Sequence, residues 1–356
     1  MSVRVGIIGT GFARRVQLPA LRLIPDVTVT AVASGRRANA ETVAKEFAIP
    51  RVCDEGGELC RSADVDLVLV SSTPDTHARY AIAALEAGKH VLCEKPMALN
   101  AGEAERMVAV AERAPGRVAW VDHELRYEPN RRKIRDLIRS GAIGEVRHIE
   151  ILLKPYVRGD GRPQAAAAPW SWWVDASRGG WLLNAVGSHL IDLCRFWSGS
   201  EAVLVAGGVA TFVAERLDEA GVVRPVTADE YASFTLRLAN GVAATVTLSG
   251  VAHHGPGHFA QVTGSEGTLV LTGETRLELG KPGGPLEDVG AADDLWERVT
   301  PNNMWARSFV RLMRDSCRAV QGRGPEGTPA SFRDGLAVQR VLDAVRAGGG
   351  KLTPLD

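Results

Sequence analysis

The sequence predicts an α/β protein of two domains: an amino-terminal doubly wound parallel sheet, then an α+β domain with a large, mainly antiparallel open sheet. The chain has 356 residues, more than one hydrophobic core usually serves. Short apolar strands alternate with amphipathic helices up to about residue 122, whereas strands follow one another directly from Glu145 onward. We therefore predict domains at 1–122 and 123–356, with terminal helices within 303–347 packing back.

Composition and charge narrow the possible partners. Lys plus Arg and Asp plus Glu each number 42, so the chain has no electrostatic signature of nucleic-acid or anionic-membrane binding. The longest apolar run, 202–214, is too short to span a bilayer. Five cysteines without a CxxC pair are typical of reduced thiols. We expect a cytoplasmic protein that acts on a small molecule, with no nucleic-acid and no membrane partner.

A glycine loop follows the first predicted strand. Val3–Ile8 leads into Gly9–Phe12 and a helical segment, the order that a pyrophosphate site requires. Gly9 permits the tight turn, and Gly11 lets the backbone approach a phosphate at the helix amino terminus. Arg14 replaces the third glycine of the full pattern. The predicted dinucleotide-binding residues here are Gly9, Thr10, Gly11 and Phe12; the alternative is an ordinary βα turn.

The residues that follow the second predicted strand indicate whether the cofactor is NADP(H) or NAD(H). Val27–Ala33 is followed by Ser34, where a carboxylate is expected if the ribose carries a free 2′-hydroxyl. A serine hydroxyl together with the guanidinium groups of Arg36 and Arg37 suits a 2′-phosphate instead. We predict that NADP(H) is preferred and NAD(H) possible. The alternative is that both arginines are solvated at the start of the next helix.

The stretch 88–97, GKHVLCEKPM, places a lysine at a strand end. The predicted strand His90–Cys93 delivers Glu94, Lys95 and Pro96 at its carboxyl end, where open α/β sheets bind ligands. Pro96 stops the strand and restricts Lys95 to extended backbone, and the bond between them can be cis. Lys95 is therefore either a pocket residue or a surface lysine just past a strand.

The glycine loop and the Glu-Lys-Pro motif on the fifth strand resemble the Gfo/Idh/MocA family of NAD(P)-dependent oxidoreductases. The stretch 179–192 resembles that family's Gly-Gly…Asp-x-Gly-x-His-x-x-Asp sequence: His189 and Asp192 match, and Ala185 stands in place of the catalytic Asp. Over essentially the whole chain, the resemblance implies a Rossmann domain and hydride transfer between nicotinamide and a secondary alcohol or ketone of a sugar, cyclitol or related polyol. Lys95 would hydrogen-bond the reacting oxygen, and His189 would transfer the proton.

The resemblance implies further site residues. On the cofactor side these are Ser72, Thr73, Pro74, His77, Glu94 and Lys95, although His77 can equally bond its own backbone. At the crossing to the second domain, Arg126 and Tyr127 match the family pattern, and Glu124 stands where Asn is usual. The predicted substrate-binding residues are Glu124, Arg126, Tyr127, Trp170, Trp173, Asn184 and His189.

Some of these residues have structural alternatives. Trp170 and Trp173 can stack on a sugar ring or fill a core. His189 can be a core histidine bonded to Asp192 one turn on. The histidines of 252–258, AHHGPGH, lie in a glycine- and proline-rich turn without a carboxylate pair, so we predict no metal site. The run 159–169 is low in bulky side chains and predicts a surface loop.

The second domain reads as successive strands. They are predicted at 145–154, 202–213, 229–238, 241–249, 261–263 and 268–271, with a type I′ hairpin at Asn240-Gly241 and helices at 303–321 and 331–347. One face of such a sheet can be covered by its own helices and the other by a second subunit. We therefore expect a homodimer or homotetramer formed through this sheet.

Two other functions fit the same fold. One is redox-neutral, NAD-dependent cleavage of glycosides. The other is a non-catalytic regulator that senses a dinucleotide. Ala185 favours the regulator, whereas the presence of Lys95 and His189 disfavours it.

Overall fold

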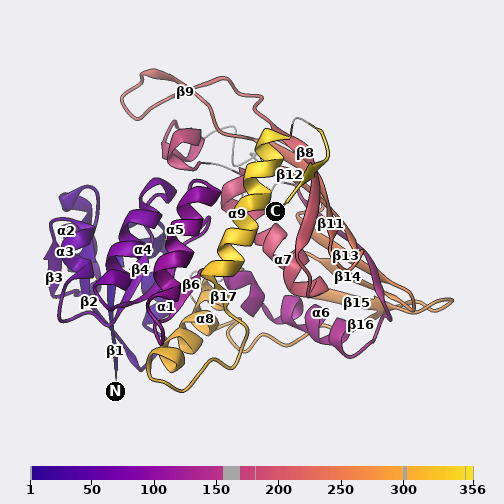
Figure 1. Ribbon diagram of the computed structural model, residues 1–356, viewed down its shortest axis with the longest axis horizontal. Coiled ribbons are helices and arrows are strands. Elements are labelled where there is room, and N and C mark those ends of the chain that lie inside the picture. Colours follow the sequence, from indigo (N-terminus) through magenta and orange to yellow (C-terminus); the bar gives the residue numbers. More distant parts are fainter. Residues whose placement is uncertain (1, 155–168, 181, 300–302, 349, 356) are drawn as a thin grey trace. The chain divides into compact units, whose positions relative to one another are not determined.

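The computed structural model describes residues 2–154, 169–180, 182–299, 303–348 and 350–355. Most of the predicted loop at 159–169, and Trp181 of the glycine-rich stretch, lie outside these residues. The chain divides into two compact units, the first formed by 1–128 and 293–336 and the second by 129–292 and 337–356. The predicted fold class is confirmed: the first unit has a parallel sheet of the Rossmann type, and the second a mainly antiparallel one (Figure 1).

The sheet of the first unit is doubly wound. Within the described residues its strand order is β17-β6-β5-β4-β1-β2-β3. The bounds are β1 (Val3–Ile8), β2 (Val27–Ala33), β3 (Arg51–Cys53), β4 (Leu67–Val70), β5 (His90–Cys93), β6 (Ala119–Val121) and β17 (Ala330–Ser331), of which only β17 is antiparallel to its neighbour. The order reverses at β1, so the carboxyl ends of β1 and β4 flank the crevice where such sheets bind ligands.

Helices cover both faces of this sheet (Figure 1). The helical segments are η1 (Ala13–Gln17), α1 (Leu18–Leu21), α2 (Arg37–Phe47), α3 (Gly56–Cys60), η2 (Pro74–Thr76), α4 (His77–Glu86), α5 (Ala101–Glu112), η3 (Glu124–Tyr127) and α8 (Met304–Val320). One hydrophobic core joins β1 to α1, α2 and α8, and the other joins the opposite face to α3, α4 and α5. Every residue of β4 and β5 is buried, as a parallel strand covered on both faces requires.

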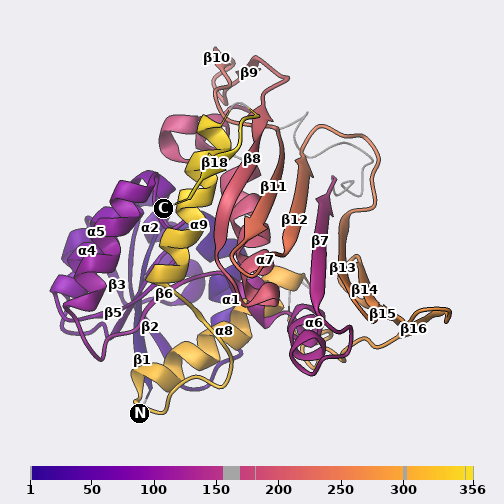
Figure 2. The same cartoon turned by 45° about the vertical axis from the view of Figure 1, so that its right-hand side comes forward.

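The second unit is built on one large sheet. Figure 2 shows its strands side by side, and within the described residues their order is β16-β15-β14-β13-β7-β12-β11-β8-β18. The bounds are β7 (Val146–Leu153), β8 (Ala202–Ala210), β11 (Tyr231–Leu238), β12 (Ala243–Ser249), β13 (His258–Gly264), β14 (Thr268–Thr272), β15 (Arg276–Gly280), β16 (Leu286–Asp288) and β18 (Thr353–Pro354), and only β7 and β12 pair in parallel.

The remaining elements of this unit lie outside that sheet. They are α6 (Pro129–Arg139), η4 (Trp172–Val174), η5 (Ala176–Arg178), η6 (Leu183–Gly187), α7 (Ser188–Ser198) and a separate hairpin of β9 (Glu215–Leu217) and β10 (Val223–Pro225). Helix α9 (Phe332–Ala347) begins in the first unit and ends in the second. Among the helices of the described residues, none combines the length and the apolarity that crossing a membrane requires.

Among the differences between the second sheet and the sequence prediction, two have a clear physical cause. Strand β8 ends at Ala210 because the amides of Phe212 and Val213 donate to the buried Glu230 carboxylate, at 2.9 and 2.8 Å. The hairpin between β11 and β12 is confirmed, but its predicted type I′ turn is wrong. That turn needs two positive φ angles, and only Gly241 has one, at 88°. The hydrogen bonds from Gly241 N and Leu238 N to Leu238 O and Val242 O define a type I turn followed by a glycine bulge.

This turn gives a test of the fold. Gly241→Ala forces a side chain into the left-handed region and should lower the free energy of unfolding by about 1–2 kcal/mol. Gly208→Ala is the matched control, because Gly208 on β8 has no positive φ and a Cβ there meets no atom within 4 Å. That control should be neutral or stabilising by about 0.5–1 kcal/mol. Chemical denaturation measures both, and equal effects would contradict the assigned turn.

Candidate active site

The glycine loop has the form that a dinucleotide requires. Gly9 has φ 105°, and a Cβ there would lie 2.2 Å from the carbonyl oxygen of Ser71, so only glycine lets the ends of β1 and β4 approach. Gly11 differs, because a Cβ at this exposed position meets no atom within 4 Å. The backbone of Gly11 faces open space at the start of a helix, which fits a pyrophosphate.

Beyond β2, the predicted cofactor residues divide into two groups. The Ser34 hydroxyl lies 3.2 Å from that of Thr10, which joins the glycine loop to the end of β2. Arg36 is exposed immediately before α2. Arg37 donates to Glu41 at 2.8 Å and also pairs with Asp54, so its guanidinium already has carboxylate partners. Ser34 and Arg36 are therefore better placed than Arg37 to receive a 2′-phosphate.

Gln17 joins the ends of three parallel strands. It lies in η1, a π-helical turn, and is 1% exposed. Its Nε2 donates to Glu94 Oε1 at 2.9 Å and to Asp122 Oδ2 at 3.2 Å, and its Oε1 accepts from the Ser71 hydroxyl at 2.5 Å. Ser71, Glu94 and Asp122 directly follow β4, β5 and β6. One buried amide thus fixes the carboxyl edge of the sheet relative to the helix after the glycine loop.

Lys95 is half-buried at this edge. Its Nζ lies 5.9 Å from the ring centre of Phe12 and 6.0 Å from that of Trp305 on α8, at the outer limit of cation–π contact. Its backbone N–H donates to the Glu94 carboxylate at 3.2 Å, and the Lys95-Pro96 bond is cis. The lysine is therefore packed between the glycine loop and α8 within the first unit, rather than exposed just past a strand.

His77 holds two loops of the cofactor side together. It is 1% exposed, with Nδ1 2.9 Å from the carbonyl oxygen of Pro96 and Nε2 3.1 Å from that of Ser72. Burial lowers the pKa of this histidine, so it is neutral and donates to only one of the two. Thr73 and Pro74 lie in the turn that these contacts hold, where the Thr76 amide bonds the Thr73 carbonyl oxygen.

Three buried carboxyl groups lie near Lys95. Burial raises the pKa of Glu94, and the Lys95 charge opposes that effect. Burial and the charges of Glu124 and Glu94 raise the pKa of Asp122 well above its ordinary value. Burial, then the charge of Glu94, raise the pKa of Glu124 to about 8. Burial thus favours the protonated form of all three carboxyl groups.

The crossing segment has partners inside the first unit. The Arg126 guanidinium donates to Asp334 at 3.0 Å and to the Pro329 carbonyl oxygen at 3.3 Å. The Tyr127 hydroxyl donates to Asp315 at 2.8 Å, and the ring is 2% exposed. Both side chains, predicted to bind substrate, thus also hold the crossing segment in place.

In the second unit, His189 lies in the first turn of α7, as the sequence predicts, and is 1% exposed. A second π-helical turn, η6, leads into it. The Asp229 carboxylate accepts from Leu183 N at 2.7 Å and so caps η6. Asn184 accepts from Arg346 at 2.5 Å and donates to the Gly179 carbonyl oxygen at 2.9 Å, so its amide orients the backbone before the histidine.

Trp170 and Trp173, the two tryptophans predicted to bind substrate, differ in their contacts and exposure. Trp170 Nε1 donates to the Pro225 carbonyl oxygen at 2.8 Å, which binds this indole to the β9–β10 hairpin. Trp173 is 36% exposed, and its ring centre lies 5.0 Å from that of Trp172. Trp173 therefore keeps more surface for a ligand than Trp170 does.

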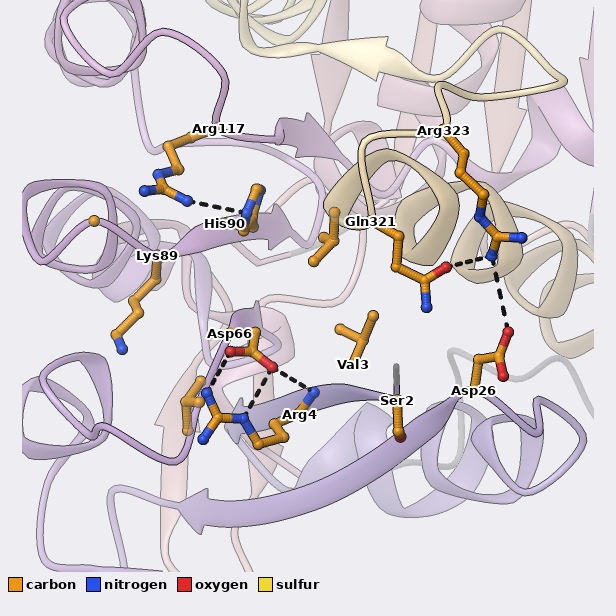
Figure 3. Close-up of a pocket in the computed structure, with 13 residues that line it drawn as sticks. Ser2, Val3, Arg4, Asp26, Asp66, Lys89, His90, Arg117, Gln321 and Arg323 are labelled. Carbon is orange, nitrogen blue, oxygen red and sulfur yellow. Dashed lines mark hydrogen bonds and ion pairs between the residues drawn. The ribbon is translucent and has the colours of Figure 1, made fainter.

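A hollow of about 890 Å³ lies at the other edge of the first sheet, at the amino-terminal ends of β1, β4 and β5. Figure 3 shows that its charged side chains face one another. Asp66 accepts from Arg4 at 2.6 Å, and Arg323 lies 3.8 Å from Asp26. Because these charges are largely balanced and the glycine loop lies at the opposite edge, we do not assign the chemistry to this hollow.

Sequence reasoning missed several residues that shape the site. They are Gln17, Ser71, Asp122, Trp305, Asp229 and Arg346. Gln17 carried a usable signal, because it is a polar residue within the otherwise apolar stretch Val16–Leu21. Asp122 directly follows an apolar strand, which is a second such signal. Trp305 and Arg346 are distant in sequence from the motifs and gave none.

The fold and this edge define a dinucleotide-dependent oxidoreductase, and comparison with known proteins agrees. The family described as "Oxidoreductase family, NAD-binding Rossmann fold" matches residues 3–123, and the GFO/IDH/MocA C-terminal domain matches 131–270. An uncharacterized oxidoreductase of Synechocystis, sll0816, is 32% identical over 97% of this chain and 93% of its own length. The chain belongs to the Gfo/Idh/MocA family, as its motifs predicted, and is an NAD(P)-dependent oxidoreductase.

Other relatives cover the chain equally well. Glucose-fructose oxidoreductase domain-containing protein 2 of Xenopus laevis is 30% identical over 96% of this chain and 90% of its own length. An oxidoreductase domain protein from Kribbella flavida has a TM-score of 0.88 at 28% identity, and each chain is covered completely. A levoglucosan dehydrogenase in complex with NADH and L-sorbose has the same TM-score at 23% identity, covering 100% of this chain and 99% of its own, which shows the fold.

The roles of Gly9 and Gly11 in stability and in cofactor binding can be distinguished by experiment. Gly11→Ala should leave the melting temperature almost unchanged but reduce dinucleotide affinity at least about tenfold, because the methyl group fills the space beside the helix start. Gly9→Ala should instead lower the free energy of unfolding by about 2–4 kcal/mol, since its Cβ meets the Ser71 backbone. Thermal melts and fluorescence titrations measure these effects. Unchanged affinity in Gly11→Ala would remove the loop from the cofactor site.

Proposed function

We propose that this enzyme uses NADP(H) to interconvert a secondary alcohol and a ketone on a sugar, cyclitol or related polyol. The observation that carries the proposal is the half-buried Lys95, held at the carboxyl edge beside the glycine loop by Glu94 and Pro96. An ammonium group fixed at this edge stabilises negative charge that develops on a carbonyl oxygen. The bound cofactor supplies the hydride chemistry, and the chain supplies orientation and proton transfer.

Lys95 and His189 are the two proposed catalytic residues. Lys95 hydrogen-bonds the reacting oxygen and keeps its charge through the reaction, while His189 exchanges the oxygen's proton. The amide of Asn184 and the cap at Asp229 keep the turn before His189 in place. The loop geometry and the family motifs support Gly9 to Phe12, Ser72 to Pro74 and His77 as proposed cofactor-binding residues.

An exposed aromatic side chain and the names of similar proteins support the proposed substrate class. Trp173, with 36% of its surface exposed, offers an apolar face to a sugar ring, and we retain Glu124, Arg126 and Tyr127 as proposed substrate-side residues. Two proteins of similar fold are a levoglucosan dehydrogenase and an aldose-aldose oxidoreductase from Caulobacter crescentus, at 23% identity each. Their names agree with a sugar or polyol substrate.

We also infer a homodimer or homotetramer formed through the second unit. Along β11 and β12, buried residues alternate with half-exposed ones, so one sheet face packs on helices and the other is available to a second subunit.

The five cysteines are all buried free thiols, which suits the reducing cytoplasm.

The cofactor proposal rests on Arg36. A charge-assisted bond to the 2′-phosphate contributes about 1.5–3 kcal/mol, so NADP(H) should bind at least about tenfold tighter than NAD(H). Arg36→Ala should remove most of this difference and leave NAD(H) binding unchanged. Lys45→Ala, which removes an exposed charge from the last turn of the same helix, is the control and should keep the preference. Equal affinities in the parent protein would refute the assignment.

The reaction is tested by screening polyol oxidation and keto-sugar reduction through NADPH absorbance. With an active substrate, Lys95→Met should reduce turnover about 10²–10⁴-fold with little change in melting temperature or cofactor affinity. Lys89→Met is the control, because Lys89 bonds the Ser62 carbonyl oxygen at the opposite edge of the sheet. His189→Asn should cost about 10²-fold or more.

Each of the two alternative functions predicts a different experimental result. A cofactor retained through purification, with glycoside cleavage but no net absorbance change, would indicate the redox-neutral enzyme. Dinucleotide binding without turnover of any polyol, sugar or glycoside, in the parent as in Lys95→Met, would indicate the regulator.

A further inference from the structure

His90 lies at the start of β5, in the hollow at the amino-terminal edge of the first sheet. Its backbone N–H donates to the Asp66 carbonyl oxygen at 3.0 Å, as the parallel pairing of β4 with β5 requires. The side chain is 7% exposed. The backbone N–H of Val118, just before β6, donates to His90 Nδ1 at 3.0 Å. The neighbouring strand therefore fixes the imidazole ring in the wall of the hollow.

The bond from Val118 determines which ring nitrogen of His90 carries a proton. A backbone N–H can only donate, so Nδ1 accepts and the proton of the neutral ring lies on Nε2. The opposite tautomer would set two N–H groups against each other at a buried position. Burial, and then the charge of Arg117, lower the pKa of His90, so the ring carries a single proton at neutral pH. His90 Nε2 is therefore a donor.

Arg117 meets this donor with another donor. Its Nη1 lies 3.3 Å from His90 Nε2, and Figure 3 shows the guanidinium facing the imidazole ring. A guanidinium group has N–H donors and no acceptor. The two nitrogen atoms thus cannot bond each other, whereas an acceptor atom beside both would receive a hydrogen bond from each.

The other cations of the hollow lie close to carboxylates. Asp66 accepts from Arg4 at 2.6 Å, and Arg4, and more weakly Lys89, lower the pKa of this carboxyl group. Arg323 lies 3.8 Å from Asp26. The two carboxylates that line the hollow therefore already face three of its four cationic side chains.

Arg117 is the remaining cation, and neither a carboxylate nor a helix end accounts for it. Among the residues that the structure describes, it forms no ion pair with an acidic side chain. Lys89 and Arg323 lie within one turn of the ends of α4 and α8, where helix dipoles favour a cation. Arg117 instead follows the turn at Gly116, whose φ is 80°, and leads into β6. Its charge is therefore left without an anionic partner.

We propose that Arg117 and His90 form a binding site for a small oxyanion, either a phosphate or a carboxylate group. One oxygen atom accepts from both His90 Nε2 and Arg117 Nη1, and the guanidinium can donate a further N–H to a second oxygen of the same group. A water molecule would satisfy the two donors but not the charge of Arg117, so a charged oxygen is favoured.

This site is separate from the proposed reaction. It lies at the edge of the sheet opposite the glycine loop and Lys95. The hollow, of about 890 Å³, has room for the remainder of an organic anion beyond the group that Arg117 and His90 hold.

The tautomer of His90 can be measured directly. Nitrogen-15 NMR of protein labelled at histidine should show His90 protonated at Nε2 and unprotonated at Nδ1 at neutral pH. His90→Gln identifies these signals by removing them. A proton on Nδ1 alone would overturn the proposal, because Nε2 would then accept from Arg117 and no other acceptor would be needed.

Binding is tested with inorganic phosphate, on protein saturated with NADPH so that the phosphate-binding positions at the glycine loop are occupied. The His90 Nε2 signal should shift saturably as phosphate is added. Arg117→Gln should weaken this binding at least about tenfold, because it removes a charge-assisted hydrogen bond. Arg113→Gln is the matched control: Arg113 is an exposed arginine at the end of α5, outside the hollow, and its loss should leave the affinity unchanged.

Other probes distinguish the source of the oxyanion. Tighter binding of citrate than of phosphate would indicate a carboxylate ligand, the reverse order a phosphate ligand, and neutral glycerol should leave the His90 signal unchanged. If Arg117→Gln does not fold, Arg117→Lys removes the planar guanidinium but keeps the charge, and should also weaken binding. No saturable shift with either anion, or equal affinities in the Arg117 and Arg113 variants, would overturn the proposal.

Discussion

The hydrogen bonds of Gln17 are the interaction on which the proposed active site depends. Its amide joins Ser71, Glu94 and Asp122, the residues that directly follow β4, β5 and β6, to the helix after the glycine loop. A hydrogen bond between uncharged groups contributes about 0.5–1.5 kcal/mol, and a buried polar group that loses its partner costs about 1–3 kcal/mol. The position of Lys95 follows from this constraint, because its backbone is fixed by Glu94 on one side and by Pro96 on the other. A leucine at position 17 would fit the apolar surroundings but remove the donor that Glu94 Oε1 and Asp122 Oδ2 share.

Each unit contains a π-helical turn at its part of the candidate site. A π-helical turn, Ala13–Gln17, points Gln17 into the carboxyl cluster of the first unit, and a second one, Leu183–Gly187, precedes His189 in the second. Such turns insert an extra residue into a helix, reorient the side chains around it and often occur at functional sites. In the second unit, Gly187 also lets α7 pack closely on β12, since a Cβ there would lie 3.0 Å from Leu248.

Much of the fold was predictable, because the buried parallel strands have a plain signal. Val3–Ile8, Val27–Ala33 and His90–Cys93 are strands with the predicted bounds, and Asn303 caps the predicted helix α8. The type I′ turn could not be excluded from Asn240-Gly241 alone, because both hairpin types place glycine at the left-handed position. The motifs also located Lys95 and His189, but not the residues that hold them. Gln17, Trp305 and Arg346 act through contacts distant in sequence, and the carboxyl cluster depends on the pairing of β5 with β6.

The central claim is that the edge organised by Gln17 and Lys95 serves direct hydride transfer. NADPH deuterated at C4 of the nicotinamide, prepared as each of the two stereoisomers, can be incubated with a panel of keto-sugars and oxidised cyclitols. The account predicts that one stereoisomer transfers its deuterium to a carbinol carbon of the product, as seen by mass spectrometry. Cofactor binding without any transfer of label, or label released to water instead, would contradict it.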